Sequence, residues 1–147
     1  MIFIPVTGNS SDAPQIKSFE DCVPLVSYVT NQKDALSKAD LQYFLSTFSN
    51  NHCINNVEFS EYGNEVLFSL MESNPNLFFE ALFSLGQGQI ETIKVQINNP
   101  VDDSINVVKI YKAIESSNMH KDLKMKALNF LKEAYEKEQK SVHVETP

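Results

Sequence analysis

Apolar residues recur along most of this chain with the spacing of an α-helix rather than that of a β-strand. The clearest case is the segment SKADLQYFLSTFSNN, where four large apolar residues follow at i, i+3, i+4 and i+7: Leu41, Phe44, Leu45 and Phe48. That spacing places all four side chains on one helical face. Ser37 and Asp40 precede them with the spacing of a capping box, so a helix is predicted to begin at Ser37.

The same period predicts one earlier and five later helices. The earlier one holds Pro24 in its first turn, with Val26, Val29 and Cys22 as candidates for its inner face. The later ones are predicted at about 60–73, 75–85, 88–98, 103–117 and 120–139. Between the two groups, the Asn-rich segment 49–56 breaks the period and is interpreted as a loop.

Capping residues mark several of the predicted ends. Ser60 suits the N-cap of helix 60–73, and Asp102 or Asp103 suits that of helix 103–117. The pair Asn74-Pro75 suits an N-cap followed by a first helical position, and Gly86 suits a left-handed residue after a helix end. The main alternative to a helix is a short strand at 92–97, where TIKVQI alternates in polarity.

The predicted fold is therefore all-α, as an irregular bundle or a short stack of six to seven helices joined as antiparallel hairpins. At 147 residues the chain has the usual length of one domain. We expect an irregular lead-in at 1–17, a single helical domain at 18–140 and a short tail at 141–147. Helices 60–73 and 75–85 are predicted to form the central hairpin.

Charge narrows the classes of partner. The formal net charge is −7, and all 12 basic residues are lysine. Nucleic acid is not expected as a partner, because phosphate repels an acidic surface and base recognition relies on the arginine fork. Anionic membranes are disfavoured for the same reason, and no apolar run is long enough for a transmembrane segment. We expect a soluble chain, with the cytoplasm favoured over export and the compartment left open.

The two cysteines, Cys22 and Cys53, leave a structural question open. They lie in a predicted helix and in the predicted loop, and free thiols are favoured over a disulfide. The N-terminal start lacks the basic and apolar regions of a signal peptide. Asn9-Ser10-Ser11 fits a glycosylation sequon, a weak pattern that matters only in a secreted eukaryotic chain.

The sequence contains no recognised motif for catalysis, for a cofactor or for a metal. Gly86-Gln87-Gly88 lacks the third glycine and the preceding strand of a dinucleotide site. His52 and Cys53 are adjacent, but with Cys22 they do not have a recognised zinc-ligand spacing. We predict no catalytic residue, no cofactor and no metal site, and whether the chain is an enzyme stays open.

Helix 75–85 is unusually rich in aromatic residues. Its polar stripe is narrow, formed by Asn76, Glu80 and Ser84, and nearly everything else on the helix is apolar. A helix that is apolar around most of its circumference is normally central to a core. The alternative is a groove or dimer surface along the edge of Phe79 and Phe83, which lies nearest the polar stripe.

Helix 60–73 gives the strongest signal for binding. Glu61, Glu65 and Glu72 share the face opposite its apolar side, Glu58 lies in line with them, and Phe68 sits among these carboxylates. Either another layer of the same chain covers the Phe68 ring, or a partner does. An exposed aromatic with a charged rim has the composition of an interface hot spot.

Three hypotheses for function follow. The first is a non-catalytic protein–protein interaction module, such as a small acidic inhibitor, that binds through the face of Phe68. The second is a homo-oligomeric structural subunit that covers its own Phe79 and Phe83 edge. The third is an enzyme or small-ligand binder that uses carboxylates in an apolar cleft. The partner in the first two cases is another protein or a second copy of the chain.

Overall fold

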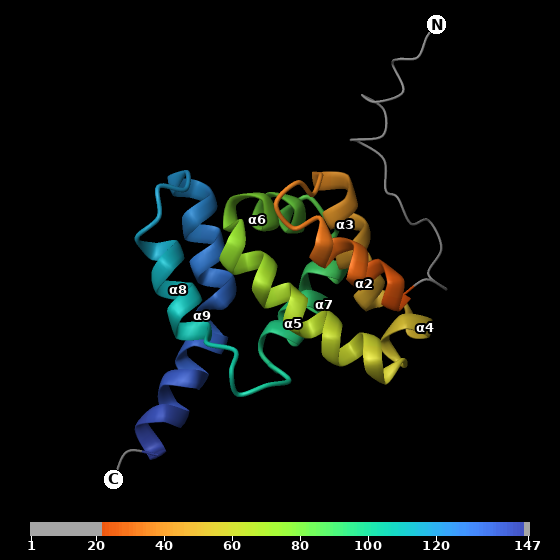
Figure 1. Cartoon of the computed structure of the whole chain (residues 1–147). Coiled ribbons are helices and arrows are strands. Elements are labelled where there is room, and N and C mark those ends of the chain that lie inside the picture. The colour runs from red at the N-terminus through yellow and green to blue at the C-terminus, as the bar shows by residue number, and fades with distance from the viewer. Residues whose placement is uncertain (1–21, 146–147) are drawn as a thin grey trace, which may run out of the picture.

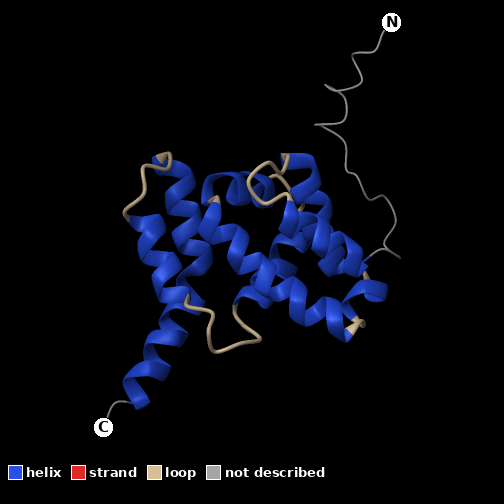
Figure 2. Cartoon of the chain, in the orientation of Figure 1, coloured by secondary structure: helices blue, strands red, loops and turns tan. Residues whose placement is uncertain are grey.

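The computed structural model describes residues 22–145, with side chains described up to residue 140, and this part is helical with no strand (Figure 2). The predicted lead-in at 1–17, the sequon at 9–11 and the last two residues of the predicted tail lie outside it. The elements are α2 (Cys22–Asn31), α3 (Lys38–Ser46), the 3-10 turn η2 (Thr47–Ser49), α4 (Asn51–Ile54), α5 (Val57–Ser73), α6 (Pro75–Phe83), α7 (Gln87–Ile97), α8 (Val107–Glu115) and α9 (Lys121–Glu145).

The all-α prediction is confirmed, with eight α-helices in the described residues instead of six or seven. The strand alternative for 92–97 is wrong, since those residues belong to α7 and bury Ile93 and Ile97 at helical spacing. Segment 49–56 is not a plain loop either, because it contains the short helix α4. Helix α9 runs to Glu145, beyond its predicted end at about 139.

Helix α5 occupies the middle of the molecule (Figure 1). It packs against α2, α4, α6, α7 and α8. In Figure 1, α2, α3 and α4 lie on one side of α5, and α8 and α9 lie side by side on the other. Residues from both halves of the chain therefore meet on the surface of α5.

Two of the predicted helix starts are confirmed by hydrogen bonds. The Ser37 hydroxyl accepts from the backbone N–H of Asp40. The Asn74 side chain accepts from the backbone N–H of Leu77, and Pro75 occupies the first turn of α6.

Three other predicted ends are wrong. Asn56, not Ser60, caps α5 through the backbone N–H of Phe59. Asn106 caps α8 in place of Asp102 or Asp103, because residues 98–106 are held in a loop by side chains of other helices. Gly86 has the extended conformation of an N-cap before α7, and not the left-handed one.

Glycine at position 63 permits a close approach in the core. A Cβ atom built on Gly63 would lie 3.2 Å from the Phe48 ring, which is tighter than ordinary van der Waals contact. The Phe48 ring also contacts Phe44 and Phe59, with centroids 5.4 Å and 5.2 Å away. The absence of a side chain at Gly63 thus lets an aromatic ring of η2 lie directly on α5.

The aromatic helix α6 belongs to the core, as its apolar circumference predicted. Phe78 and Phe79 are fully buried. The Phe79 ring stacks on Phe83 at 5.7 Å, and both contact Phe130 of α9 edge-on at about 6 Å. Phe83 keeps partial exposure. Because α9 covers this edge within the same chain, Phe79 offers no surface for a groove or a dimer.

Cys22 and Cys53 form a disulfide, so the preference for two free thiols is wrong. Their Cα atoms are 5.5 Å apart, a distance that suits a disulfide, and both residues are buried. The bond joins the start of α2 to α4 across a sequence separation of 31 residues. Sequence spacing could not predict this pairing, because it depends on α2 and α4 meeting at the same end of α5.

Reduction of this disulfide should destabilise the fold. A cross-link that closes a loop of this length is expected to contribute about 3–4 kcal/mol in the chain-entropy account. We therefore expect Cys22→Ala/Cys53→Ala, or the reduced chain, to unfold at a clearly lower denaturant concentration, as followed by circular dichroism. Intact mass before and after alkylation would establish the oxidised state, and an unchanged midpoint would contradict a stabilising role.

A buried carboxylate links α2 to α3. Asp40 is 5% exposed and accepts a hydrogen bond from the Tyr28 hydroxyl at 2.9 Å. Burial, followed by this hydrogen bond and by the negative charge of Asp40, raises the pKa of Tyr28 to about 12. The phenol therefore stays protonated in the folded state at a pH where it ionises in the unfolded chain.

The raised pKa of Tyr28 predicts a loss of stability in alkali. Its contribution is complete below the ordinary tyrosine pKa of 10.0 and is lost as the pH rises towards about 12. The ionisation of Tyr28 is expected to lower the free energy of unfolding by about 1 kcal/mol, because solvent partly screens this site. When the pH is raised from 10.0 to about 12, the denaturant midpoint of unfolding should decrease less for Tyr28→Phe than for the matched control Tyr62→Phe. Equal slopes in the two variants would contradict this prediction.

Candidate functional site

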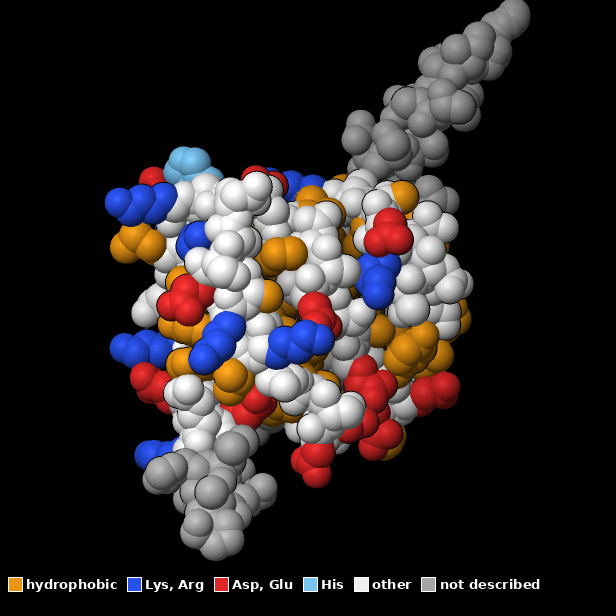
Figure 3. Space-filling model, turned by 60° about the vertical axis from the view of Figure 1, so that its left-hand side comes forward, with side chains coloured by type: hydrophobic (Ala, Val, Ile, Leu, Met, Phe, Trp, Pro, Cys, Tyr) orange, Lys and Arg blue, Asp and Glu red, His pale blue; other side chains and the backbone are white. Residues whose placement is uncertain are grey.

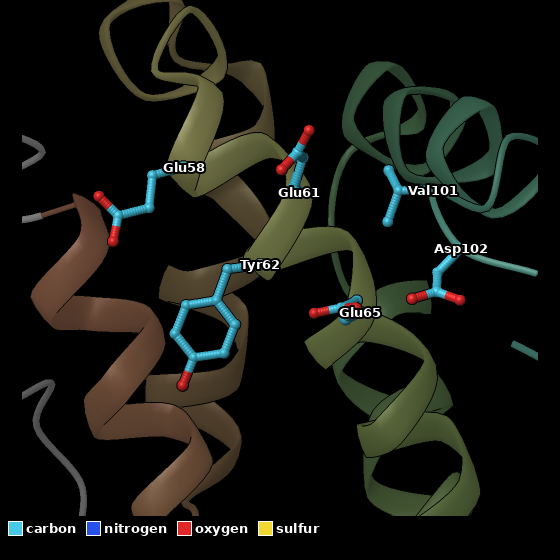
Figure 4. Close-up of a pocket in the computed structure, with 6 residues that line it drawn as sticks. All are labelled: Glu58, Glu61, Tyr62, Glu65, Val101 and Asp102. Carbon is cyan, nitrogen blue, oxygen red and sulfur yellow. The ribbon is translucent and has the colours of Figure 1, made fainter. Parts of the chain in front are cut away.

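An acidic hollow lies between α5 and the loop that joins α7 to α8 (Figure 4). Helix α5 contributes Glu58, Glu61, Tyr62 and Glu65, and the loop contributes Val101 and Asp102. The three glutamates share a helical face because they are spaced at i, i+3 and i+7. The hollow is open to solvent and measures roughly 380 Å³. We call these six residues the acidic groove.

Asn64 sets the position of the loop that forms one wall of the groove. Its side chain is fully buried, and its amide donates to the backbone carbonyl of Gln96 and to the Gln96 side chain, both at 3.1 Å. Its carbonyl oxygen accepts from the backbone N–H of Val101 at 3.1 Å. One side chain of α5 thus fixes the end of α7 and the loop residue that precedes Asp102.

Helix α9 holds the same loop from the opposite side. The Lys137 ammonium donates to the backbone carbonyl of Asn98 at 2.9 Å. The Glu138 carboxylate accepts from the backbone N–H groups of Val107 and Val108, at 2.9 Å and 3.1 Å. An open hollow of roughly 660 Å³ lies between this loop and α9. Because α5 and α9 anchor its two ends, the loop keeps Val101 and Asp102 beside α5.

The groove concentrates negative charge. In Figure 4 the carboxylates of Glu65 and Asp102 lie next to each other, one on α5 and one on the loop. The pKa of Asp102 is lowered, first by the backbone N–H of Ser104, which donates to it at 2.7 Å, and then by the Ser104 hydroxyl. Asp102 therefore keeps its charge to a lower pH than an ordinary aspartate.

No cation balances this charge within the described part of the chain. Glu58, Glu61, Glu65 and Asp102 are exposed, and none of them forms an ion pair with a described lysine. Figure 3 shows acidic side chains gathered in the lower right of one face without lysine among them, while lysines lie mainly towards the left. Such an unpaired patch attracts cationic groups and repels anionic ones.

The Phe68 ring is not part of an exposed surface. It is 3% exposed, so of the two alternatives, cover by the same chain is the one that the structure shows. The cover comes from the start of α8 and the loop before it, which leave a small hollow of roughly 260 Å³ lined by Phe68, Ile105 and Ile110 among others. Since α8 comes from a distant part of the sequence, the pattern of α5 alone could not place it there.

The other predicted site residues lie in three different places. Glu61 and Glu65 lie in the acidic groove. Glu72 lies further along α5 and pairs with Lys109 of α8, with 3.2 Å between the ammonium and the carboxylate. Phe79 and Phe83 lie in the aromatic cluster with Phe130, away from the groove residues. The structure therefore brings together only the first part of the predicted acidic face.

Sequence reasoning missed Asn64, Val101 and Asp102 as parts of this site. Val101 is an isolated valine in a polar segment, and Asp102 was assigned to a helix cap, so neither carried a signal. Asn64 did carry one, since its amide lies among the apolar positions of α5, between Leu67, Phe68 and Met71 on the helical wheel. A polar residue in a buried stripe requires hydrogen-bond partners from elsewhere in the fold.

Two kinds of feature are absent from the described residues. Among the side chains of residues 22–140, no group of three or more His, Cys, Asp and Glu is arranged to hold a metal ion. No helix in the same part of the chain has the length and apolarity needed to cross a membrane. Comparison with family models found no match, and comparisons with curated proteins and with solved structures found none either.

Replacement of Asn64 should loosen the groove. In Asn64→Ala the backbone groups of Gln96 and Val101 lose their partner, and each unpaired buried group is expected to cost about 1–3 kcal/mol. We expect a lower denaturant midpoint and faster amide hydrogen exchange at Val101 and its neighbours. The exposed Asn129→Ala is the matched control and should change stability by less than about 0.5 kcal/mol. Unchanged exchange at Val101 would contradict the role assigned to Asn64.

Proposed function

We propose that this chain is a non-catalytic protein-binding module, and that its acidic groove holds a lysine- or arginine-rich segment of another protein. The observation that carries the proposal is the set of four unpaired carboxylates around one hollow, with Tyr62 and Val101 as its apolar part. Cationic side chains would pair with the carboxylates, and their aliphatic stems would lie on the apolar residues.

The surroundings of the groove also favour binding to a protein segment. Val101 is 46% exposed, and Val57, in the first turn of α5, is 70% exposed. Such exposed apolar side chains would contact the aliphatic stems of a bound cationic segment. In this proposal Tyr62 and Val101 take the role that the sequence pattern assigned to Phe68.

Exposure argues for binding over catalysis. The groove carboxylates lie open to water, whereas the closed clefts in which many enzymes carry out their chemistry exclude it. We further propose that the scaffold behind the groove is an irregular helical bundle with neighbouring helices paired as antiparallel hairpins. The extensive packing of α8 on α9 supports that arrangement.

We also propose that the protein works in an oxidising compartment. The Cys22–Cys53 disulfide supports this, because disulfides persist in secreted and periplasmic proteins and are rare in a reducing cytosol. The preference for the cytoplasm, which was based on the sequence alone, is replaced by this proposal. Intact mass of the endogenous protein after alkylation without reduction would test it, and two alkylated thiols would overturn it.

A short cationic peptide provides a direct test of the groove. Titration of isotopically labelled protein with hexalysine should shift the amide resonances of residues 58–65 and 101–103 more than those elsewhere. Raising the salt concentration should weaken the binding, since exposed charges are screened. Neutralisation of all four carboxylates, in Glu58→Gln/Glu61→Gln/Glu65→Gln/Asp102→Asn, should reduce the affinity at least about tenfold, because each lost charge pair contributes a few tenths to 1 kcal/mol.

The matched control removes four negative charges from another face. Glu115→Gln/Asp122→Asn/Glu133→Gln/Glu136→Gln has the same net charge as the groove variant, and its substituted residues are exposed on α8 and α9. It should bind hexalysine nearly as well as the unmodified chain. Equal losses in the two variants, or shifts spread evenly over the surface, would show that net charge and not the groove attracts the peptide.

A further inference from the structure

Charge is distributed unevenly along this chain. Residues 107–140, which form α8 and most of α9, contain 8 of the 12 lysines and 5 acidic residues. Residues 1–106 contain the other 4 lysines and 13 acidic residues. The protein thus combines an acidic groove on α5 with a lysine-rich pair of helices elsewhere on its surface.

One line of α9 presents lysine together with apolar surface. Lys121, Met125, Leu128 and Lys132 are spaced at i, i+4, i+7 and i+11, which places them along one side of the helix. Met125 is 61% exposed, both lysines are exposed and Leu128 is partly buried. We call these four residues the α9 stripe.

The lysines of the stripe are as free as the carboxylates of the groove. Within residues 22–140 neither Lys121 nor Lys132 pairs with a carboxylate. Asp122 and Glu136 border the stripe on one side, and Lys124 lies on its other side. Both surfaces are therefore available to a partner of opposite charge.

We propose that the α9 stripe of one copy docks in the acidic groove of a second copy, so that the protein associates with itself. This proposal rests on the proposed function of the groove and names its occupant. Carboxylates alone would describe an ordinary solvated surface. The choice of a second copy follows from the match of an apolar side chain flanked by lysines with a hollow that has a tyrosine, a valine and four carboxylates.

The association is expected to be weak and sensitive to salt. Single exposed ion pairs contribute little, and the net charge of −7 opposes the approach of two copies. The electrostatic attraction between the groove carboxylates and the stripe lysines acts over a few ångströms. Screening at high ionic strength removes most of this attraction. Because groove and stripe are different surfaces, the contact joins unlike parts of two copies and can lead to dimers or longer assemblies.

The experiment measures the mass of the full chain by sedimentation over a hundredfold range of protein concentration. At about 0.02 M salt the average mass should rise above the 16.6 kDa of one chain, and at about 0.5 M salt it should return to that value. A groove variant, Glu61→Lys/Glu65→Lys, and a stripe variant, Lys121→Glu/Lys132→Glu, should each stay monomeric alone.

An equal mixture of the two variants gives the decisive result. In the mixture the two new lysines in the groove of one variant can pair with the two new glutamates in the stripe of the other, and the unmodified groove can hold the unmodified stripe. We expect the mixture to associate at low salt although each variant alone does not. Glu80→Lys/Glu91→Lys changes the net charge as the groove variant does, at exposed positions on α6 and α7, and should associate like the unmodified chain.

The possible failures are distinguishable. A chain that stays monomeric at low salt, or an association that survives in both double variants, would overturn the docking of stripe in groove. If hexalysine still shifted the groove residues in that case, the groove would remain a site for a different cationic partner. If neither the peptide nor a second copy bound there, both proposals would be overturned.

Discussion

The acidic groove depends on one fully buried amide. Asn64 lies on the inner side of α5, where water cannot satisfy its donors and acceptor, so the fold must supply partners for them. It finds them in the end of α7 and in the backbone of Val101. These bonds turn a polar loop into a fixed wall beside α5. From α9, Lys137 bonds Asn98 where the loop begins and Glu138 bonds Val107 where α8 follows it, so the wall is held at both ends.

The core around this amide follows from side-chain shape. Gly63 leaves room for the Phe48 ring, and the second aromatic cluster joins α6 to α9 through Phe79 and Phe130. Because these contacts bury the largest side chains, most of the large apolar surface of the chain lies in the core. The outward face of α5 is left with carboxylates, a tyrosine and two exposed valines nearby. Binding by charge, with a small apolar contribution, is the function that this surface favours.

Several features of the fold could be predicted from local pattern. The helical class, the caps at Ser37 and Asn74 and the core role of α6 depend on residues within one or two turns of one another. Part of the candidate site could be predicted for the same reason, since Glu61 and Glu65 share a face of any helix. The expectations that failed involve distant partners: Asp102 as a cap, Phe79 as an edge and free thiols at Cys22 and Cys53.

The sequence by itself determined that the fold is helical and which carboxylates share a side of α5, because periodicity and capping act over a few residues. Only the tertiary structure decided that α8 covers Phe68, that Cys22 meets Cys53, and that Asp102 faces Glu65 across a hollow. Those outcomes require segments separated by tens of residues to pack together. Their packing is set by the total burial and hydrogen bonding of the fold, which no short stretch of sequence contains.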